Sequence, residues 1–130
     1  MFCGTDIIEV ERIKDAINNT KGFKENIYTK NEIEDIDSIK SDIRFQRYAG
    51  RFAAKEAIYK AMSKLLIENS ITMEFLDVEI QNVKELSRRP RVVFLKKEII
   101  ELVERNNINI DISISHVSET AVATAIVLLG

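Results

Sequence analysis

The chain has 130 residues, of which 45% are hydrophobic and 31% are charged, and its formal net charge is -2 at pH 7. This length and composition are those of one globular domain, spanning residues 1–130, and they exclude a disordered or fibrous chain. The net charge excludes a polycation that coats nucleic acid, so we expect no nucleic-acid partner. The single cysteine, Cys3, excludes a disulfide framework and a zinc site built from several cysteines.

Targeting signals and common nucleotide-binding motifs are absent from the sequence. No apolar run reaches the roughly 18 residues of a membrane-spanning helix, and the N-terminus does not have the pattern of a signal peptide. We therefore expect a cytoplasmic protein that has no membrane partner. Neither a nucleophile elbow, nor a P-loop, nor a glycine-rich dinucleotide fingerprint occurs.

Hydrophobic periodicity predicts the elements in chain order. Apolar residues interrupted by Gly4 and Asp6 indicate a short first strand, and we expect Cys3 to lie in the core. The sequence Thr29-Lys30-Asn31-Glu32 is typical of a capping box at a helix start. The expected strands cover residues 2–8, 75–83, 91–95, 108–115 and 121–129. The expected helices cover residues 9–18, a segment starting near 29, and residues 41–67 and 96–105.

The last two expected strands predict a β-hairpin. Residues 108–115 alternate isoleucine with polar residues, and a loop of about five residues precedes the second strand. Ala121, Ala123 and Ala125 share one face of that strand, which permits another element to approach closely. Together the elements predict an α+β fold, in which a small antiparallel sheet packs with the long central helix.

Glu56 and Lys60 are the first candidates for chemistry. They lie four residues apart in the expected long helix and therefore share a face. One interpretation is an ion pair that stabilises the helix by about 0.3–0.5 kcal/mol. However, the surrounding sequence is apolar and rich in alanine, where a buried charge requires a partner or a ligand. A carboxylate there suits a hard cation, and an ammonium group suits a phosphate.

Asp6 is a second carboxylate in an apolar setting. It is either a capping residue at the strand end or a further metal ligand. Magnesium often takes only one or two protein carboxylates and completes its octahedron with water and substrate phosphate. Asp6 and Glu56 would therefore be sufficient for a site that handles a phosphorylated substrate.

Positive charge gathers on the expected long helix, which carries +4 over residues 41–66 of this acidic chain. Arg44, Arg47, Arg51 and Lys55 fall within about 80° of its circumference. This stripe is either a solvated face or a surface that recognises a polyanion or an acidic partner. His116, the only histidine, ends an expected strand. It is either a structural residue or one that contacts a phosphate or a nucleotide.

Four segments resemble the family of holo-[acyl-carrier-protein] synthases, the group I 4′-phosphopantetheinyl transferases. Gly4-Thr-Asp-Ile-Ile-Glu-Val-Glu-Arg12 is similar to the N-terminal motif Gly-x-Asp-(Ile/Leu)-x-Glu-x-x-Arg of the family. Arg51-Phe-Ala-Ala-Lys-Glu-Ala-Ile-Tyr-Lys-Ala61 matches its long central motif. Tyr28-Thr-Lys-Asn-Glu32 and Ile112-Ser-Ile-Ser-His116 resemble two further segments, in the order that the family has them.

The resemblance implies an enzyme that moves the 4′-phosphopantetheine arm of coenzyme A onto a serine of an apo acyl carrier protein. The second product is adenosine 3′,5′-bisphosphate, and the holo carrier serves fatty acid biosynthesis. The resemblance also implies a magnesium cofactor and a homotrimer with active sites between subunits. We expect the proton of the carrier serine to pass to a water molecule that is held by the metal, by Glu56 or by Glu9.

The matched motif positions assign a role to several residues of this chain. The resemblance gives Asp6 and Glu56 to magnesium, Lys60 to catalysis, Arg44, Arg51, Lys60 and His116 to coenzyme A, and Arg12 to the carrier protein. We also expect Glu56 to take part in catalysis and Lys64 to contact coenzyme A.

Two departures from the family pattern accompany these matches. The glycine-rich loop that follows the central motif in many members is replaced here by Met62-Ser-Lys-Leu-Leu66. We expect Lys64 to compensate for the backbone contacts to coenzyme A that this loop would provide. The common Gly-Lys-Pro turn is Arg88-Arg89-Pro90. We expect this second departure to change a turn more than the chemistry.

Overall fold

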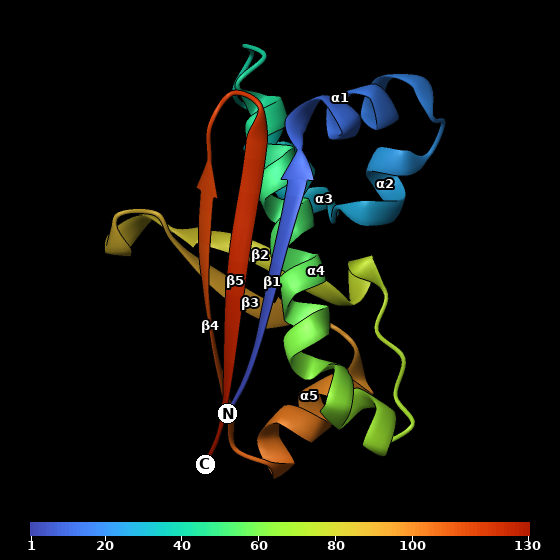
Figure 1. Ribbon diagram of the computed structural model, residues 1–130, viewed down its shortest axis with the longest axis vertical. Coiled ribbons are helices and arrows are strands. Elements are labelled where there is room, and N and C mark those ends of the chain that lie inside the picture. Colours follow the sequence, from blue (N-terminus) through green and yellow to red (C-terminus); the bar gives the residue numbers. More distant parts are fainter.

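The computed structural model describes residues 1–130 and is organised around one long helix, α4 (Arg44–Glu68) (Figure 1). A three-stranded antiparallel sheet of order β1-β5-β4 packs along this helix. Its strands are β1 (Phe2–Glu9), β5 (Thr120–Leu129) and β4 (Ile108–His116). The predicted α+β fold, with a small antiparallel sheet packed on a long helix, is confirmed.

The remaining elements lie beside the two ends and the middle of α4 (Figure 1). Three short helices lie beside its N-terminal half, and α5 lies beside its C-terminal end (Figure 1). A second sheet, not foreseen from the sequence, pairs two antiparallel strands. These elements are α1 (Val10–Asn19), α2 (Phe23–Ile27), α3 (Lys30–Asp37), α5 (Lys97–Arg105), β2 (Val78–Val83) and β3 (Arg89–Phe94), with 3₁₀ turns η1 (Phe75–Asp77) and η2 (Lys84–Leu86). No helix is long and apolar enough to cross a membrane.

The predicted elements agree with these bounds to within about three residues, apart from the η1 turn that opens the expected strand 75–83. The expected strand 91–95 begins earlier, because Pro90 pairs with Asn82 inside β3. Since β3 pairs only with β2 in its sheet, it is an edge strand that tolerates the missing proline N–H. The capping box at Thr29 is confirmed, with its side chain accepting from the Glu32 N–H.

The inner face of the three-stranded sheet is built from small residues. Ala121, Ala123 and Ala125 are fully buried, so the predicted close approach is confirmed and the approaching element is α4. The prediction for Cys3 is wrong: its side chain is exposed on the outer face of the sheet. Side chains alternate along a strand, and Gly4 takes the inward position instead.

Two glycines determine how closely α4 meets the sheet. A Cβ atom at Gly4 would lie only 2.8 Å from the Ala61 nitrogen and 2.9 Å from Lys60 Cβ. A Cβ atom at Gly50, on the helix itself, would lie 2.9 Å from Ile114 Cγ2 of β4. At Gly4 the two backbones approach too closely for a side chain, whereas at Gly50 the Ile114 side chain occupies the space that a Cβ atom would need.

Lys55, predicted as part of a basic surface stripe, is buried instead. Its Nζ donates to Glu32 Oε1 at 2.7 Å and to the carbonyls of Ile27 and Phe75 at 2.7 and 3.0 Å. Glu32 Oε2 in turn accepts from the Ile80 N–H at 2.8 Å. Burial lowers the pKa of Lys55, and the charge of Glu32 opposes that shift. The pair therefore joins α3, α4 and β2 inside the protein, and only the N-terminal part of the stripe is available to a ligand.

We predict that Gly4→Ala destabilises the protein by about 1–3 kcal/mol or more, because the added methyl forces β1 away from α4. The free energy of unfolding, measured by urea denaturation, tests this. Cys3→Ala, on the opposite face of the same strand, is the control and should change that free energy by less than about 0.5 kcal/mol. Equal stability of the two variants would contradict a close contact at Gly4.

Candidate active site

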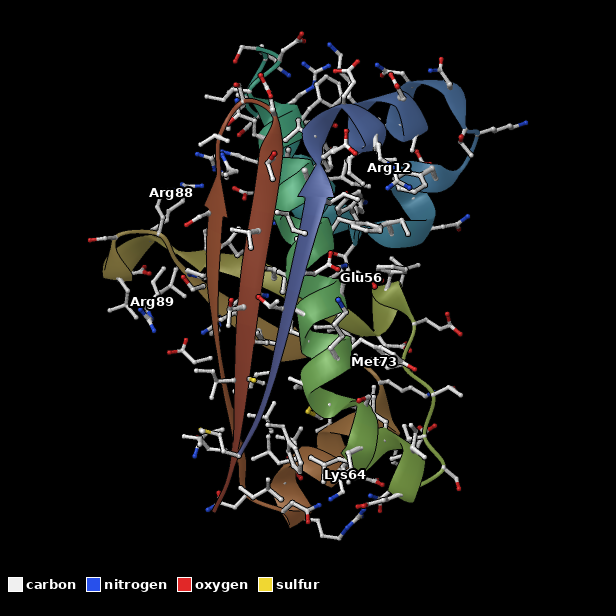
Figure 2. All side chains as sticks on the ribbon, in the orientation of Figure 1. Arg12, Glu56, Lys64, Met73, Arg88 and Arg89 are labelled. Carbon is white, nitrogen blue, oxygen red and sulfur yellow. The ribbon has the colours of Figure 1, made fainter.

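Asp6 and Lys60 meet where β1 crosses α4. Lys60 Nζ donates to Asp6 Oδ1 at 3.1 Å and to the Thr5 carbonyl at 2.9 Å. Asp6 points toward the helix because it lies two residues after the inward Gly4. Glu56 lies one turn before Lys60 on the same face of α4 and is half-buried (Figure 2). The structure therefore brings together the three residues that the sequence predicted for metal binding and catalysis.

The charges at this junction suit a small cation. Burial raises the pKa of Glu56, the negative charge of Asp6 raises it further, and Lys60 acts in the opposite direction. Two carboxylates thus repel each other, and one ammonium group offsets their charge only in part. The chain contains no cluster of three or more potential metal ligands. A pair of carboxylates fits magnesium, which takes its other ligands from water and substrate phosphate.

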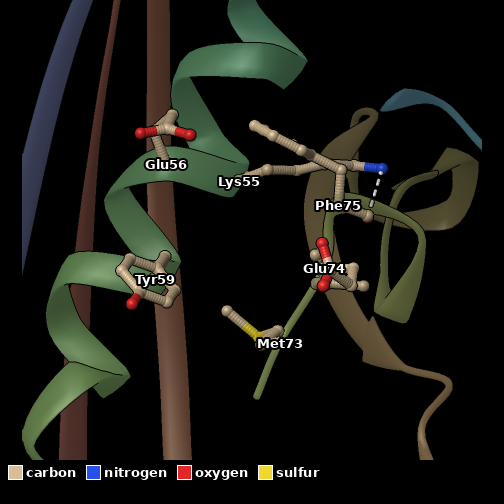
Figure 3. A pocket seen from close by; sticks show the side chains of 7 residues that line it. Lys55, Glu56, Tyr59, Met73, Glu74 and Phe75 are labelled. Atoms are coloured by element: carbon tan, nitrogen blue, oxygen red, sulfur yellow. Dashed lines mark hydrogen bonds between the residues drawn. The ribbon is translucent and has the colours of Figure 1, made fainter. Parts of the chain in front are cut away.

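A pocket of about 260 Å³ opens beside Glu56, between α4 and the segment before β2 (Figure 3). Tyr59 and Met73 lie across from each other, and the Lys55 ammonium is held by the Phe75 carbonyl at its inner end (Figure 3). The full lining is Lys55, Glu56, Tyr59, Met73, Glu74, Phe75 and Val78. The mixture of apolar walls and a carboxylate suits a flexible chain that carries a few polar groups.

A second pocket, of about 270 Å³, lies where α4, β3 and the end of β4 meet, and it is strongly basic. His116 Nδ1 is 2.9 Å from Gln46 Oε1, which orients the ring. Burial, followed by the positive charge of Arg47, lowers the pKa of His116, so the imidazole is neutral at pH 7. This basic pocket is lined by Arg47, Arg51, Asn82, Arg88, Pro90, Ile114 and His116.

Asp35 organises the guanidinium groups of the basic pocket. Its Oδ2 accepts from Arg51 Nη2 at 2.6 Å, and its Oδ1 lies 3.7 Å from Arg88 Nη2. Burial raises the pKa of Asp35, but the Arg51 hydrogen bond and the charges of Arg51, Arg88 and Arg47 outweigh it, so the pKa lies below its usual value. With Asp35 ionised, three arginines face one carboxylate, and the pocket keeps a surplus of positive charge.

Three other predicted residues lie apart from both pockets. Arg44 donates to the carbonyls of Lys40 and Ser41 at the start of α4. Lys64 is exposed, two turns beyond Glu56 along α4, with its Nζ 5.7 Å from the centre of the Phe2 ring (Figure 2). Arg12 is exposed on α1 (Figure 2).

The basic pocket also contains residues to which the sequence assigned no site. Arg47 belonged to the predicted basic stripe on the long helix. The spacing of the stripe could therefore have indicated Arg47, in place of Arg44, as a residue that binds an anion. Asn82 gave no such signal, and Arg88 stood out only as a departure from the family's Gly-Lys-Pro turn, which we expected to change a turn more than the chemistry. Their contribution depends on how the second sheet packs on α4.

The two groups of residues lie on opposite sides of α4. Arg47 and Arg51 point about 180° away from Glu56 and Lys60, at 3.6 residues per helical turn. Arg88 and Glu56 accordingly lie on either side of the layer formed by the sheet and α4 (Figure 2). One chain therefore cannot present both groups to the same face of a small ligand.

The comparisons with known proteins identify the family. Residues 2–125 match the model of the 4′-phosphopantetheinyl transferase superfamily. The chain is 45% identical over 125 residues to the holo-[acyl-carrier-protein] synthase of Fusobacterium nucleatum, with 96% of each chain covered. It is 40% identical to that of Ruminiclostridium cellulolyticum, with 100% of this chain and 93% of the relative covered. This chain therefore belongs to the 4′-phosphopantetheinyl transferase superfamily and, within it, to the holo-[acyl-carrier-protein] synthase family.

Solved structures agree with this assignment. A holo-(acyl-carrier-protein) synthase from Bacillus anthracis in complex with CoA (3′,5′-ADP) superimposes with a TM-score of 0.74 at 32% identity, covering 99% of this chain and 96% of that one. The Helicobacter pylori enzyme in complex with coenzyme A gives a TM-score of 0.72 at 28% identity, covering 97% and 99%. The chain is thus a transferase by family as well as by fold.

We predict that Asp6→Asn lowers the pKa of Glu56, because it removes a neighbouring negative charge, and that Lys60→Met raises it. The ¹³C shift of the Glu56 carboxyl group, followed against pH in metal-free protein, measures both effects. Lys64→Met is the matched control. Its charge lies eight residues from Glu56, about 12 Å along the helix and beyond one Debye length, so the pKa of Glu56 should stay the same. An unchanged pKa in Asp6→Asn would mean that the two carboxylates do not share a site.

Proposed function

We propose that this chain transfers the 4′-phosphopantetheine arm of coenzyme A to a serine of an apo acyl carrier protein and releases adenosine 3′,5′-bisphosphate. The reaction would supply holo carrier for fatty acid biosynthesis in the cytoplasm. The meeting of Asp6, Glu56 and Lys60 at one crossing of β1 and α4 is the observation that carries the proposal. Family membership and the ligand named for the Bacillus anthracis relative support it.

The chemistry needs positioning and charge compensation more than covalent help from the protein. The serine oxygen attacks the phosphorus that bears the pantetheine arm, and the bond to the bridging oxygen of the pyrophosphate breaks. Lys60 offsets negative charge that develops on the phosphate oxygens. Magnesium, held by Asp6 and Glu56, would supply further charge neutralisation at the pyrophosphate.

Glu56 is the better candidate than Glu9 for holding the water that accepts the serine proton. Glu9 ends β1 and is exposed, about 10 Å along the strand from Asp6. Glu56 borders the pocket beside α4, so a water molecule that it holds would lie close to a substrate bound there. The geometry therefore favours Glu56.

The two pockets suit the two ends of coenzyme A. The pocket beside Glu56 has apolar walls from Tyr59, Met73 and Phe75, which fit the largely aliphatic pantetheine arm with its two amides. The basic pocket, with Arg51 and His116, fits the phosphorylated nucleotide end. Arg44 and Lys64 line neither pocket and would contact coenzyme A only from its periphery.

Because the two groups of residues lie on opposite sides of α4, we assign one active site to two neighbouring subunits of a homotrimer. The outer face of the three-stranded sheet offers the contact surface. Ile7, Val122, Ile126 and Leu128 are 68%, 37%, 41% and 47% exposed on that face, an apolar patch typical of an interface. In such an assembly, Glu56 of one subunit and the basic pocket of the next face the same coenzyme A.

Arg12 is the proposed contact for the acidic carrier protein. It is exposed on α1, the helix that directly follows the strand bearing Asp6. A cation in this position would guide an acidic partner toward the reacting phosphate and contribute mainly to the rate of association.

We predict that the protein, mixed with apo acyl carrier protein, coenzyme A and magnesium, increases the carrier mass by one phosphopantetheine group. Asp6→Ala and Glu56→Ala should each reduce the rate by at least about 100-fold, since each removes charge from the reacting centre. Intact-mass spectrometry of the carrier measures transfer. Glu104→Ala on α5, far from the site, is the control and should retain the wild-type rate. A folded wild-type protein that modifies none of several carriers would refute the proposed function.

Subunit sharing predicts that two inactive variants complement each other. One variant carries Glu56→Ala and the other carries Arg47→Ala with His116→Ala, so each damages a different side of the site. Subunits mixed at random by unfolding and refolding together should recover about a quarter of the wild-type sites. Transfer rates before and after mixing, with the mass of the assembly from sedimentation, test this. A mixture no more active than its separate components would mean that each site belongs to one subunit.

A further inference from the structure

The turn between β2 and β3 holds an arginine in an unusual backbone conformation. Arg88 has φ +62° and follows Ser87 at φ +55°, so two successive residues without glycine are left-handed. Residues that carry a side chain rarely adopt the left-handed region. Such strained conformations are concentrated at functional sites, where the surrounding structure holds the residue in place. Glycine at this place would relieve the strain, as in the family turn that this segment resembles.

The conformation directs Arg88 into the basic pocket. Its guanidinium lines that pocket together with Arg47, Arg51 and His116. Asn82 connects the turn to α4: with its amide oriented to satisfy both groups, its oxygen accepts from Arg51 Nη2 at 2.9 Å and its nitrogen donates to the Arg88 carbonyl at 3.3 Å. The backbone of Arg88 is thus tied to the arginine at the centre of the pocket.

The Arg88 guanidinium is more available to a ligand than that of Arg51. Arg51 is 6% exposed and lies 2.6 Å from Asp35, so its donors are largely engaged. Arg88 is 45% exposed, and its ion pair with the same carboxylate is loose at 3.7 Å. An anion entering the pocket can therefore exchange that contact for a bidentate one with Arg88, while Arg51 stays in place.

The chemistry of coenzyme A identifies the anion. Its pyrophosphate contains the bond that breaks and must lie at Asp6, Glu56 and Lys60. The phosphate group that remains is the monoester on the ribose 3′ oxygen, a dianion that matches a pocket with surplus positive charge. We propose that Arg88 is a specificity-determining residue that recognises the 3′-phosphate of coenzyme A, an inference that rests on the proposed function.

The neighbouring arginine provides a matched comparison. Arg89 points away from the basic pocket, with Nη2 2.7 Å from Asp111 Oδ2 on β4. Both residues are positively charged and lie at the same turn, and they extend in different directions (Figure 2). A general effect of positive charge would involve both residues equally, whereas recognition of the phosphate involves Arg88 alone.

The experiment compares Arg88→Gly with Arg89→Gly, using ligands with and without the 3′-phosphate. Glycine accepts φ +62° without strain, so Arg88→Gly should fold at least as well as the wild type. Calorimetry with adenosine 3′,5′-bisphosphate and adenosine 5′-monophosphate measures binding. Transfer from coenzyme A and from 3′-dephospho-coenzyme A measures kcat/KM.

We expect Arg88→Gly to reduce the preference for the 3′-phosphorylated ligand by about tenfold or more in both measurements, from the loss of one charge-assisted bidentate contact. Values for the ligands without that phosphate should stay constant, and Arg89→Gly should keep the wild-type preference. An equal loss for both ligands, no loss, or the same loss in Arg89→Gly would overturn the role of Arg88. If the wild type transfers nothing, the proposed function is refuted instead. The ratio of the affinities for adenosine 3′,5′-bisphosphate and adenosine 5′-monophosphate then still decides the role of Arg88.

Discussion

The close contact between β1 and α4 is the constraint on which the candidate site depends. Gly4 allows the strand to touch the helix backbone beside Ala61, and the inward alternation then places Asp6 within reach of Lys60. The buried alanines of β5 extend the same contact across the sheet. At the other end of the helix, Gly50 allows a similar contact with Ile114, which brings His116 to Arg47. The spacing between the layers thus creates both charged sites.

The buried ion pair between Lys55 and Glu32 has a related structural role. Lys55 immediately precedes Glu56 and is held by the carbonyls of Ile27 and Phe75, so the helix cannot rotate without breaking these bonds. Removing one member of such a pair typically costs about 3–5 kcal/mol, because the other charge remains buried without a partner. Lys55 thus fixes the rotation of α4 and therefore the direction of Glu56.

The sequence predicted most of the fold because the periodic patterns are local. The alternation in β4, the capping box at Thr29 and the alanine face of β5 each depend on neighbours along the chain. The error at Cys3 shows the limit of predicting burial from periodicity, because the pattern of a strand that is apolar on both faces does not reveal which face is inward. The burial of Lys55 and the assembly of Asn82 and Arg88 with Arg51 depend on contacts between distant segments. Charge spacing on one helix could not reveal them.

The arrangement around α4 also gives a physical reason for the proposed sharing of one active site between neighbouring subunits. A single helix presents Glu56 on one side and Arg51 on the other, and the sheet that supports it covers a third side. A larger protein could bring a second lobe to the reacting centre, whereas this chain has only copies of itself. The outer face of its three-stranded sheet exposes Ile7, Val122 and Ile126, whose burial between copies would stabilise the proposed assembly. In the proposed assembly, the apolar face that brings the copies together is thus the face through which the active site would be completed.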